Sequence, residues 1–277
     1  MITFQKYVKA ESLEEAYTLN QGPKNKILGG MLWLRMGHPT YNTVIDISGL
    51  GLGDIEEDDE QITIGAMATL RDIETHPGLN AYTNGAVKRA VEDIIGVQFR
   101  NLATVGGSIW GRFGFSDVLT VFLALDSYVE LYKGGIVSLN EFSQMDYDND
   151  ILMHLIVKKK PCTCVYDAVR IQRTDFPVLT CAACMMENQV RVSIGARSGK
   201  ARLYTTMLGT GAFSEGFTLP AISKYSEELT ELVPTSGNNR GSAEYRSRLV
   251  GVLSNRCLTA IYDRFRMIAE KVMKKED

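Results

Sequence analysis

Along the first 160 residues, short stretches of alternating apolar and polar positions are followed by stretches with helical spacing. Period-two alternation predicts strands, and apolar residues at steps of three or four predict amphipathic helices. The predicted strands cover 2–8, 26–28, 41–47, 61–65, 128–132 and 151–157. The predicted helices start after Ser12, whose partner Glu15 completes a capping box, follow Thr69 over 70–74, and cover 82–93 and 117–126. This region is predicted to be of the α+β class.

Beyond residue 160 the pattern changes. Four strand-like stretches at 164–173, 181–187, 189–197 and 201–208 are joined by short turns, which predicts a small antiparallel sheet. The chain ends in a long helix whose apolar stripe is Tyr245, Leu249, Leu253, Cys257, Ile261, Phe265, Ile268 and Val272, a packing face. Lys158 to Pro161 interrupts the pattern. We therefore expect domains at 1–160, with subdomains of about 1–53 and 54–160, and at 161–277.

Composition narrows the class of protein. The chain has 277 residues, of which 45% are hydrophobic and 23% are charged, values typical of folded chains with a sizeable core. Its net charge of -3 gives no electrostatic reason to bind nucleic acid. No apolar stretch has the length of a signal peptide core or a membrane helix. We expect a cytoplasmic protein with no membrane partner.

Five cysteines include two close pairs, Cys162 with Cys164 and Cys181 with Cys184. Four thiolates suffice in principle for zinc or an iron–sulfur cluster. Both pairs lie among small or β-branched residues, where buried cysteine behaves as a small hydrophobe. We expect reduced thiols that pack in the core, and no metal site.

Two glycine pairs are candidates for binding an anion. Gly29-Gly30 follows a predicted strand, and Gly106-Gly107 lies in a second loop over 101–108. A strand that ends in glycines before a helix leaves backbone N–H groups that suit a diphosphate. Neither loop is a Walker loop or a G-x-G-x-x-G fingerprint. Paired glycines also mark tight turns in any α+β fold, so this alternative stays open.

Several segments, in order over nearly the whole chain, resemble one family. They are ILGGMLWLRM at 27–36, ITIGAMATLRDI at 62–73, RNLATVGGSIWGRFGFSDVLTVFLALDS at 100–127, DILMHLIV at 150–157, VRIQRTDFP and VRVSIGARSGKA. Together they resemble the FAD-binding medium subunit of molybdenum hydroxylases, of the xanthine dehydrogenase and carbon monoxide dehydrogenase type. The segment from Arg100 to Asp117 is the most specific, because it carries glycine, hydroxyl and carboxylate at fixed offsets.

The resemblance implies an FAD lobe of the vanillyl-alcohol-oxidase (PCMH) type, in which two α+β subdomains clasp noncovalent FAD, followed by a small C-terminal domain of antiparallel sheet and helices. It assigns the first diphosphate loop to Gly29, Gly30, Met31, Leu32 and Trp33, and the second to Thr104, Gly106, Gly107 and Ser108. Ser116 and Asp117 match a family pair, with Asp117 accepting from a sugar or ribityl hydroxyl. Leu152 is assigned to contact the flavin or adenine, and Arg170 to lie near the isoalloxazine.

The chain departs from the family at both loops. The first commonly reads Ala-Gly-Gly-Thr-Asp/Glu-Leu, so that Met31 and Leu32 here replace a hydroxyl and a carboxylate. In the second, Ser108 replaces the usual Asn, and Trp110-Gly-Arg-Phe-Gly replaces small residues and proline. Three interpretations of this stretch stay open: Arg112 pairs with a phosphate, Trp110 and Phe113 cover a ring of the cofactor, or all three side chains pack within the protein.

The function that the resemblance implies is electron relay. Electrons from a molybdenum-cofactor subunit pass an iron–sulfur subunit, reach FAD here, and go to NAD or another acceptor. No residue of the chain is expected to act as a catalytic acid, base or nucleophile, since His38, His76 and His154 are scattered. The alternatives are a scaffold or assembly subunit with a decayed FAD site, and a stand-alone flavin reductase such as UDP-N-acetylenolpyruvoylglucosamine reductase.

Overall fold

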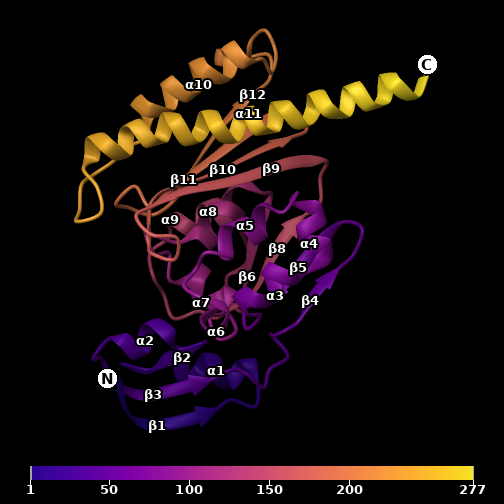
Figure 1. Cartoon of the computed structure of the whole chain (residues 1–277). Coiled ribbons are helices and arrows are strands. Elements are labelled where there is room, and N and C mark those ends of the chain that lie inside the picture. The colour runs from indigo at the N-terminus through magenta and orange to yellow at the C-terminus, as the bar shows by residue number, and fades with distance from the viewer. Residues whose placement is uncertain (1, 277) are drawn as a thin grey trace. The chain divides into compact units, whose positions relative to one another are not determined.

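The computed structural model describes residues 2–276, without the side chains of residues 269 and 271–276 in the last helix. The described chain folds into two compact units, and Figure 1 shows their elements. Unit 1 comprises the chain up to His76, Ile94–Arg112 and Asp126–Lys159, and unit 2 comprises Pro77–Asp93, Phe113–Leu125 and the chain from Lys160 onward. Two internal segments of the first 160 residues thus belong to unit 2. The division into domains at residue 160 stays a prediction.

Unit 1 contains a small parallel sheet in the order β1-β3-β2. One helix, α1, packs against its central strand, and buried Ala16 and Ile45 lie in their shared core. The Ser12 hydroxyl accepts from the backbone N–H of Glu15, as predicted, whereas the Glu15 carboxylate accepts from Glu11. The elements are β1 Thr3–Lys9, α1 Leu13–Asn20, β2 Lys26–Leu28, α2 Leu32–Met36 and β3 Thr40–Asp46.

The rest of unit 1 is an antiparallel sheet in the order β4-β5-β8-β6-β7. Helix α7 lies against β8 and β5, and α9 lies against β6 and β7. The strands are β4 Ile55–Glu57, β5 Gln61–Gly65, β6 Ser127–Leu131, β7 Gly135–Ser138 and β8 Leu152–Lys158. The helices are α3 Leu70–Thr75, α6 Val97–Arg100, α7 Val105–Trp110 and α9 Leu139–Gln144.

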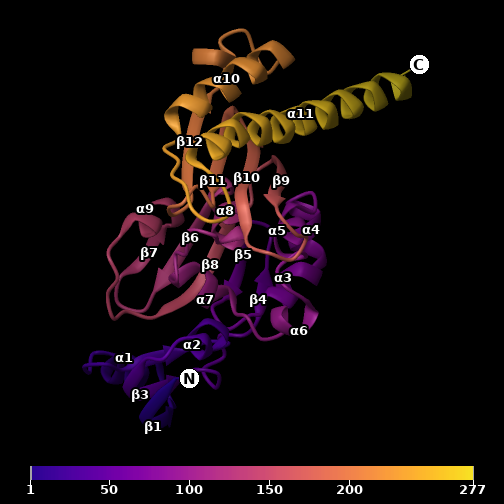
Figure 2. The same cartoon turned by 60° about the vertical axis from the view of Figure 1, so that its left-hand side comes forward.

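Unit 2 is built on an antiparallel sheet in the order β12-β11-β10-β9, with helices on both faces. Helices α10 and α11 cover one face, and α5 and α8 cover the other (Figures 1 and 2). Because both faces are covered, all ten residues of β10 are buried. The strands are β9 Cys162–Arg170, β10 Pro177–Met186, β11 Gln189–Gly195 and β12 Arg202–Met207. The helices are α4 Pro77–Tyr82, α5 Ala86–Val91, α8 Asp117–Ala124, η1 Gly211–Phe213, α10 Leu219–Leu232 and α11 Ala243–Glu276.

Helix α8 is buried along its whole length. At its beginning, the Ser116 hydroxyl accepts from the N–H of Leu119. At its end, the Arg191 guanidinium of β11 donates to the carbonyl oxygens of Leu123, Ala124 and Leu125, at 3.2, 2.8 and 2.9 Å. Both sets of terminal backbone groups therefore have partners inside unit 2, which a buried helix requires.

The α+β class is confirmed, and two finer predictions are wrong. The helix predicted over 82–93 covers only 86–91 as α5, and Tyr82 ends the preceding helix α4, because Asn84 and Gly85 adopt left-handed backbone, with φ of 54° and 79°. An Asn-Gly pair is a turn signal that the apolar spacing concealed. The packing stripe of the last helix holds for Leu249, Leu253, Cys257 and Ile261, whereas Tyr245, Phe265 and Ile268 are exposed. The side chain of Val272 lies outside those described. Among the described residues, neither α11 nor another helix is long and apolar enough to cross a membrane.

The five cysteines are free thiols of unit 2, four of them buried and Cys162 half-buried. Cys164 and Cys184 lie opposite each other on β9 and β10, while Cys181 packs with Cys257 of α11. Burial and the neighbouring thiol raise the pKa of Cys257. Within residues 2–276, no group of three or more His, Cys, Asp or Glu side chains is placed to hold a metal ion.

Candidate functional site

The first glycine loop connects β2 to α2. Met31 lies at the N-cap of α2 in left-handed backbone, with φ of 60°. Among the hydrogen bonds of residues 2–276, none is donated by the backbone N–H of Gly29, Gly30, Met31 or Leu32. Consecutive N–H groups around a left-handed residue form a concave donor set for anions. The loop therefore offers backbone donors, although its side chains carry neither hydroxyl nor charge.

The second glycine loop, by contrast, uses its backbone donors internally. The N–H groups of Val105 and Gly106 donate to the carbonyls of Ala68 and Ala66, both at 2.8 Å. The N–H of Gly107 donates to the hydroxyl of Thr104, the N-cap of α7, and the N–H of Ser108 donates to the Thr104 carbonyl. The Ser108 hydroxyl also donates to that carbonyl, at 2.9 Å. This loop has little left to donate besides the Thr104 hydroxyl.

The two loops pack directly against each other inside unit 1. A Cβ atom on Gly30 would lie 1.7 Å from the carbonyl oxygen of Leu102, and one on Gly29 would lie 2.7 Å from the Thr104 hydroxyl. A Cβ on Gly106 would lie 2.6 Å from the carbonyl oxygen of Ala66. Contacts this short exclude a side chain. Glycine is therefore required at Gly29 and Gly30 for the two loops to approach, and at Gly106 for α7 to approach Ala66, whether or not a ligand binds.

A cavity of about 120 Å³ opens beside the loops in unit 1. It brings together five residues predicted to bind the cofactor: Gly29, Thr104, Gly106, Gly107 and Leu152. Leu152, 5% exposed, begins β8 and gives the cavity an apolar wall. Trp110 and Asn20 line it as well. The cavity is thus bounded by residues of both loops and lined by apolar and polar side chains.

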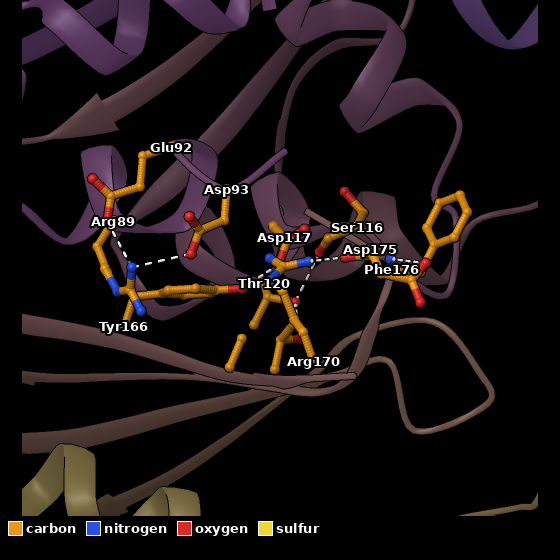
Figure 3. Close-up of polar contacts among 12 residues, drawn as sticks. Arg89, Glu92, Asp93, Ser116, Asp117, Thr120, Tyr166, Arg170, Asp175 and Phe176 are labelled. Carbon is orange, nitrogen blue, oxygen red and sulfur yellow. Dashed lines mark hydrogen bonds and ion pairs between the residues drawn. The ribbon is translucent and has the colours of Figure 1, made fainter. Parts of the chain in front are cut away.

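Three predicted residues, Ser116, Asp117 and Arg170, lie in unit 2. Asp117, the first residue of α8, is buried and accepts from Arg170 Nη2 at 2.6 Å and from the Tyr166 hydroxyl (Figure 3). Arg170 also donates to the carbonyl of Asp175 at 2.8 Å. Ser116 caps α8. The predicted site residues therefore form two groups, one in each unit.

Tyr166 is the residue that sequence reasoning missed. It lies four residues before Arg170 on β9, and both side chains reach the same carboxylate. Burial raises the pKa of Asp117, although the charge of Arg170 and the bonds from Tyr166 and Arg170 act in the opposite direction. Burial and the Asp117 charge raise the pKa of Tyr166, so its hydroxyl stays a donor. No local spacing could connect positions 49 residues apart.

The structure favours packing for Arg112. It is 2% exposed, its guanidinium lies 4.4 Å from the Phe142 ring centre and 4.2 Å from that of Tyr147, and it donates to the Met145 carbonyl at 2.7 Å. Trp110 packs against Phe142 with ring centres 5.8 Å apart. Burial lowers the pKa of Arg112. Arg112 thus ties the end of α7 to the 142–147 segment instead of presenting its charge to a phosphate.

The chain is similar in sequence and in fold to known proteins. Residues 2–159 match the model of a family described as the FAD binding domain in molybdopterin dehydrogenase. The uncharacterized protein YgfM of Escherichia coli is 24% identical over 265 residues, covering 90% of this chain and 93% of YgfM. The putative xanthine dehydrogenase FAD-binding subunit XdhB of Escherichia coli is 23% identical over 284 residues, covering 94% and 96%. A chain of the carbon monoxide dehydrogenase of Hydrogenophaga pseudoflava has the same fold, with a TM-score of 0.80 at 22% identity, covering 94% and 97%.

Proposed function

Because the chain belongs to the family of FAD binding domains in molybdopterin dehydrogenases and is an FAD-binding oxidoreductase subunit, we propose that it relays electrons. In this proposal electrons pass from iron–sulfur clusters of a partner subunit to FAD, and from FAD to NAD or another acceptor. Bound FAD supplies the redox chemistry through its isoalloxazine. The chain's own residues bind it, orient it and set its electrostatic surroundings.

The observation that carries the proposal is the first loop. Four consecutive backbone N–H groups, from Gly29 to Leu32, donate to no acceptor of the described chain. They suit a diphosphate, because a concave set of N–H groups binds anions without a charged side chain. Trp33 would close this loop on its far side. The Thr104 hydroxyl, which accepts only from Gly107, would add a donor from the second loop.

The second loop then contributes by its shape. In the proposal Gly106 and Gly107, which line the cavity, let the cofactor approach the backbone, and Leu152 contacts a ring of the cofactor. Ser108 follows them in α7. In the proposal this arrangement forms part of a two-subdomain clasp of the PCMH type. Loss of the hydroxyl and the carboxylate at Met31 and Leu32 removes side-chain contacts and leaves the backbone donors in place. The scaffold alternative, a decayed site, is therefore the weaker one.

Asp117, Ser116 and Arg170 are proposed to act on the flavin half of the cofactor. Asp117 would accept from a sugar or ribityl hydroxyl, a bond that fixes position and transfers no proton. A carboxylate held by two donors is oriented before a ligand arrives, which lowers the ordering cost of binding. Arg170 would offer positive charge near the isoalloxazine.

The proposed partners are a molybdenum-cofactor subunit and an iron–sulfur subunit. The support is that a similar protein, XdhB, is named as an FAD-binding subunit, and that the chain shares its fold with a chain of carbon monoxide dehydrogenase. Within residues 2–276 no side-chain group is placed to hold a metal ion, so clusters would come from another chain. NAD as the acceptor is proposed from the resemblance alone.

The test is titration of the purified chain, stripped of small molecules, with FAD while flavin fluorescence is followed. Saturable noncovalent binding, and copurification with iron–sulfur and molybdenum subunits on coexpression, are the expected results. A chain that binds no FAD even within such a complex would establish the scaffold alternative. If the isolated chain instead turned over a small organic substrate at about 1 to 1000 per second, the stand-alone reductase would replace relay.

A further inference from the structure

A buried ion pair in unit 1 lies immediately before the second glycine loop. Arg100, the last residue of α6, is 5% exposed, and Glu74 of α3 is 6% exposed. Arg100 Nε lies 2.6 Å from one Glu74 carboxylate oxygen and Nη2 lies 3.1 Å from the other. The third arm, Nη1, donates to the Ile94 carbonyl at 3.1 Å. A two-point bond of this kind fixes the orientation of both side chains as well as their separation.

The chain that leaves Arg100 runs alongside the segment that leads into α3. The N–H of Leu70 donates to the Ala103 carbonyl at 2.8 Å, and Thr69 pairs with Thr104 in an antiparallel bridge. Further bonds from Val105 and Gly106 to Ala68 and Ala66 continue the pairing. The ion pair therefore lies at one end of a short backbone ladder, and the glycines of the second loop lie at the other.

This ladder sets the position of the surface on which the first loop rests. The Leu102 carbonyl oxygen, two residues beyond Arg100, occupies the space in which a Gly30 side chain would lie. The Thr104 hydroxyl does the same for Gly29. At both glycines the two segments lie too close together to leave room for a methyl group. A shift of the 101–104 segment must therefore move the first loop or open a gap beneath it.

We infer that Glu74 and Arg100 are positioning residues for FAD: their ion pair holds residues 101–104 where they support the backbone donors of the Gly29-Gly30 loop. The inference rests on the proposed function, because it assigns a role in binding the same cofactor. Neither residue touches the cofactor in this account. They act through Leu102 and Thr104.

The geometry distinguishes this role from general stabilisation. Glu74 has a second partner, Arg71, whose Nη1 lies 2.9 Å from the carboxylate, but Arg71 is partly exposed and leads to neither loop. Arg71 therefore interacts with the Glu74 carboxylate, as Arg100 does, but it is not connected to the glycine loops. Lysine at position 100 would keep the charge and lose the fork, since an ammonium cannot reproduce a planar two-point bond together with the Ile94 contact.

The experiment measures the dissociation constant for FAD by flavin fluorescence in four variants of the full chain. Arg100→Lys and Glu74→Gln disturb the pair, Arg71→Ala removes the exposed partner, and Ile73→Val deletes a buried methyl group from the same helix as a stability control. All are measured well below their unfolding temperatures. Hydrogen exchange of residues 29–32 and 101–106 in the FAD-free chain gives a second readout of loop position.

Arg100→Lys is expected to raise the dissociation constant by about ten- to a hundredfold and to speed exchange in both loops. Arg71→Ala and Ile73→Val are expected to stay within about twofold of wild type. Should Arg100→Lys fail to fold, Glu74→Gln, which keeps the shape of the side chain, is read instead. Unchanged affinity in the pair variants, or an equal loss in Ile73→Val at equal stability, overturns the inference alone. A wild-type chain that binds no FAD overturns the proposed function.

Discussion

The two glycine pairs of unit 1 look alike in sequence and differ in what their backbones do. At Gly29-Gly30 the N–H groups have no acceptor in the described chain, whereas at Gly106-Gly107 each N–H is bonded within the protein. The difference comes from the neighbours. The second pair lies inside a helix and beside a backbone ladder, while the first lies between a strand and a helix that begins at a left-handed residue.

A shared dipeptide therefore has two separate reasons to be glycine. One is to leave donors for a ligand, and the other is to let two segments of the protein approach. Gly30 meets both conditions, because its N–H is unbonded and its side-chain position is filled by Leu102. Substitutions at single glycines can separate these reasons.

The largest effect is expected for Gly30→Ala. The added Cβ would lie 1.7 Å from a backbone oxygen, so the first loop must move away from the second. We expect FAD affinity to fall by roughly a hundredfold or more, with overpacking costing about 1 to 3 kcal/mol of stability. Isothermal titration measures the FAD affinity, and denaturant unfolding measures the free energy of unfolding. Near-normal FAD binding would mean that the first loop is not where the diphosphate lies.

The next largest is expected for Asp117→Ala in unit 2. Removing one partner of a buried charged hydrogen bond costs about 1.5 to 3 kcal/mol, and we expect FAD to bind about ten- to a hundredfold more weakly. Asp93→Ala is the matched control, since Asp93 also pairs with an arginine of the same unit, Arg89 (Figure 3), and with Arg173. Equal affinities in the two variants would remove Asp117 from the site.

Within the second pair, Gly106→Ala and Gly107→Ala are expected to differ in the sign of their effect on stability. At Gly106 the new methyl group would press on Ala66 and cost about 1 to 3 kcal/mol. At Gly107 the nearest neighbour of the new methyl group is the Thr104 hydroxyl at 3.0 Å. The higher helix propensity of alanine should offset this contact or raise the stability by up to about 1 kcal/mol. Thermal unfolding of both variants tests this. Identical transitions would contradict the packing account of Gly106.

The smallest effect is expected with pH. Burial raises the pKa of Glu74, but hydrogen bonds and charge from Arg100 and Arg71 outweigh it, and the net pKa lies below 4.5. Because the pKa of Glu74 is lowered in the folded state, the ionised carboxylate stabilises the fold fully above its unfolded pKa. This stabilisation is lost as the pH falls through the lowered pKa of the folded state. Glu74→Gln should therefore flatten the loss of Tm as the pH falls into the acid range in which the Glu74 carboxylate takes up its proton. Parallel curves would show that the pair does not titrate with folding.

Much of the fold could be predicted from sequence because its signals are local. Thr69 does cap a helix, with Asp72 completing the box, and four strands form in unit 2 near the four predicted stretches. The break at Asn84-Gly85 was missed because apolar spacing continues across it, although the dipeptide itself carries the signal. Local pattern is therefore reliable where one signal is present and fails where two compete.

For the candidate site, the sequence could supply single residues and short segments as predictions, and the contacts between distant segments could not be predicted. Both glycine loops are runs of neighbours, so the resemblance could assign them. The contact of Gly30 with Leu102 and that of Asp117 with Tyr166 join positions far apart in the chain, and no spacing rule connects them. The partners of Asp117 are set by the register of β9 against its neighbours, which is a property of the folded sheet.

Helix α8 has a consequence for the order of synthesis. Its eight residues are all buried in unit 2, yet they are made before the sheet that buries them, which ends with β12 at Met207. At about 5 to 20 residues per second, the ribosome needs several seconds to add those strands. During that interval the helix can pack against α5, which is made earlier, but it lacks the strands β10 and β11 that cover it in the folded unit. A newborn chain is therefore most open to capture by chaperones, or to aggregation, between the synthesis of α8 and that of β12.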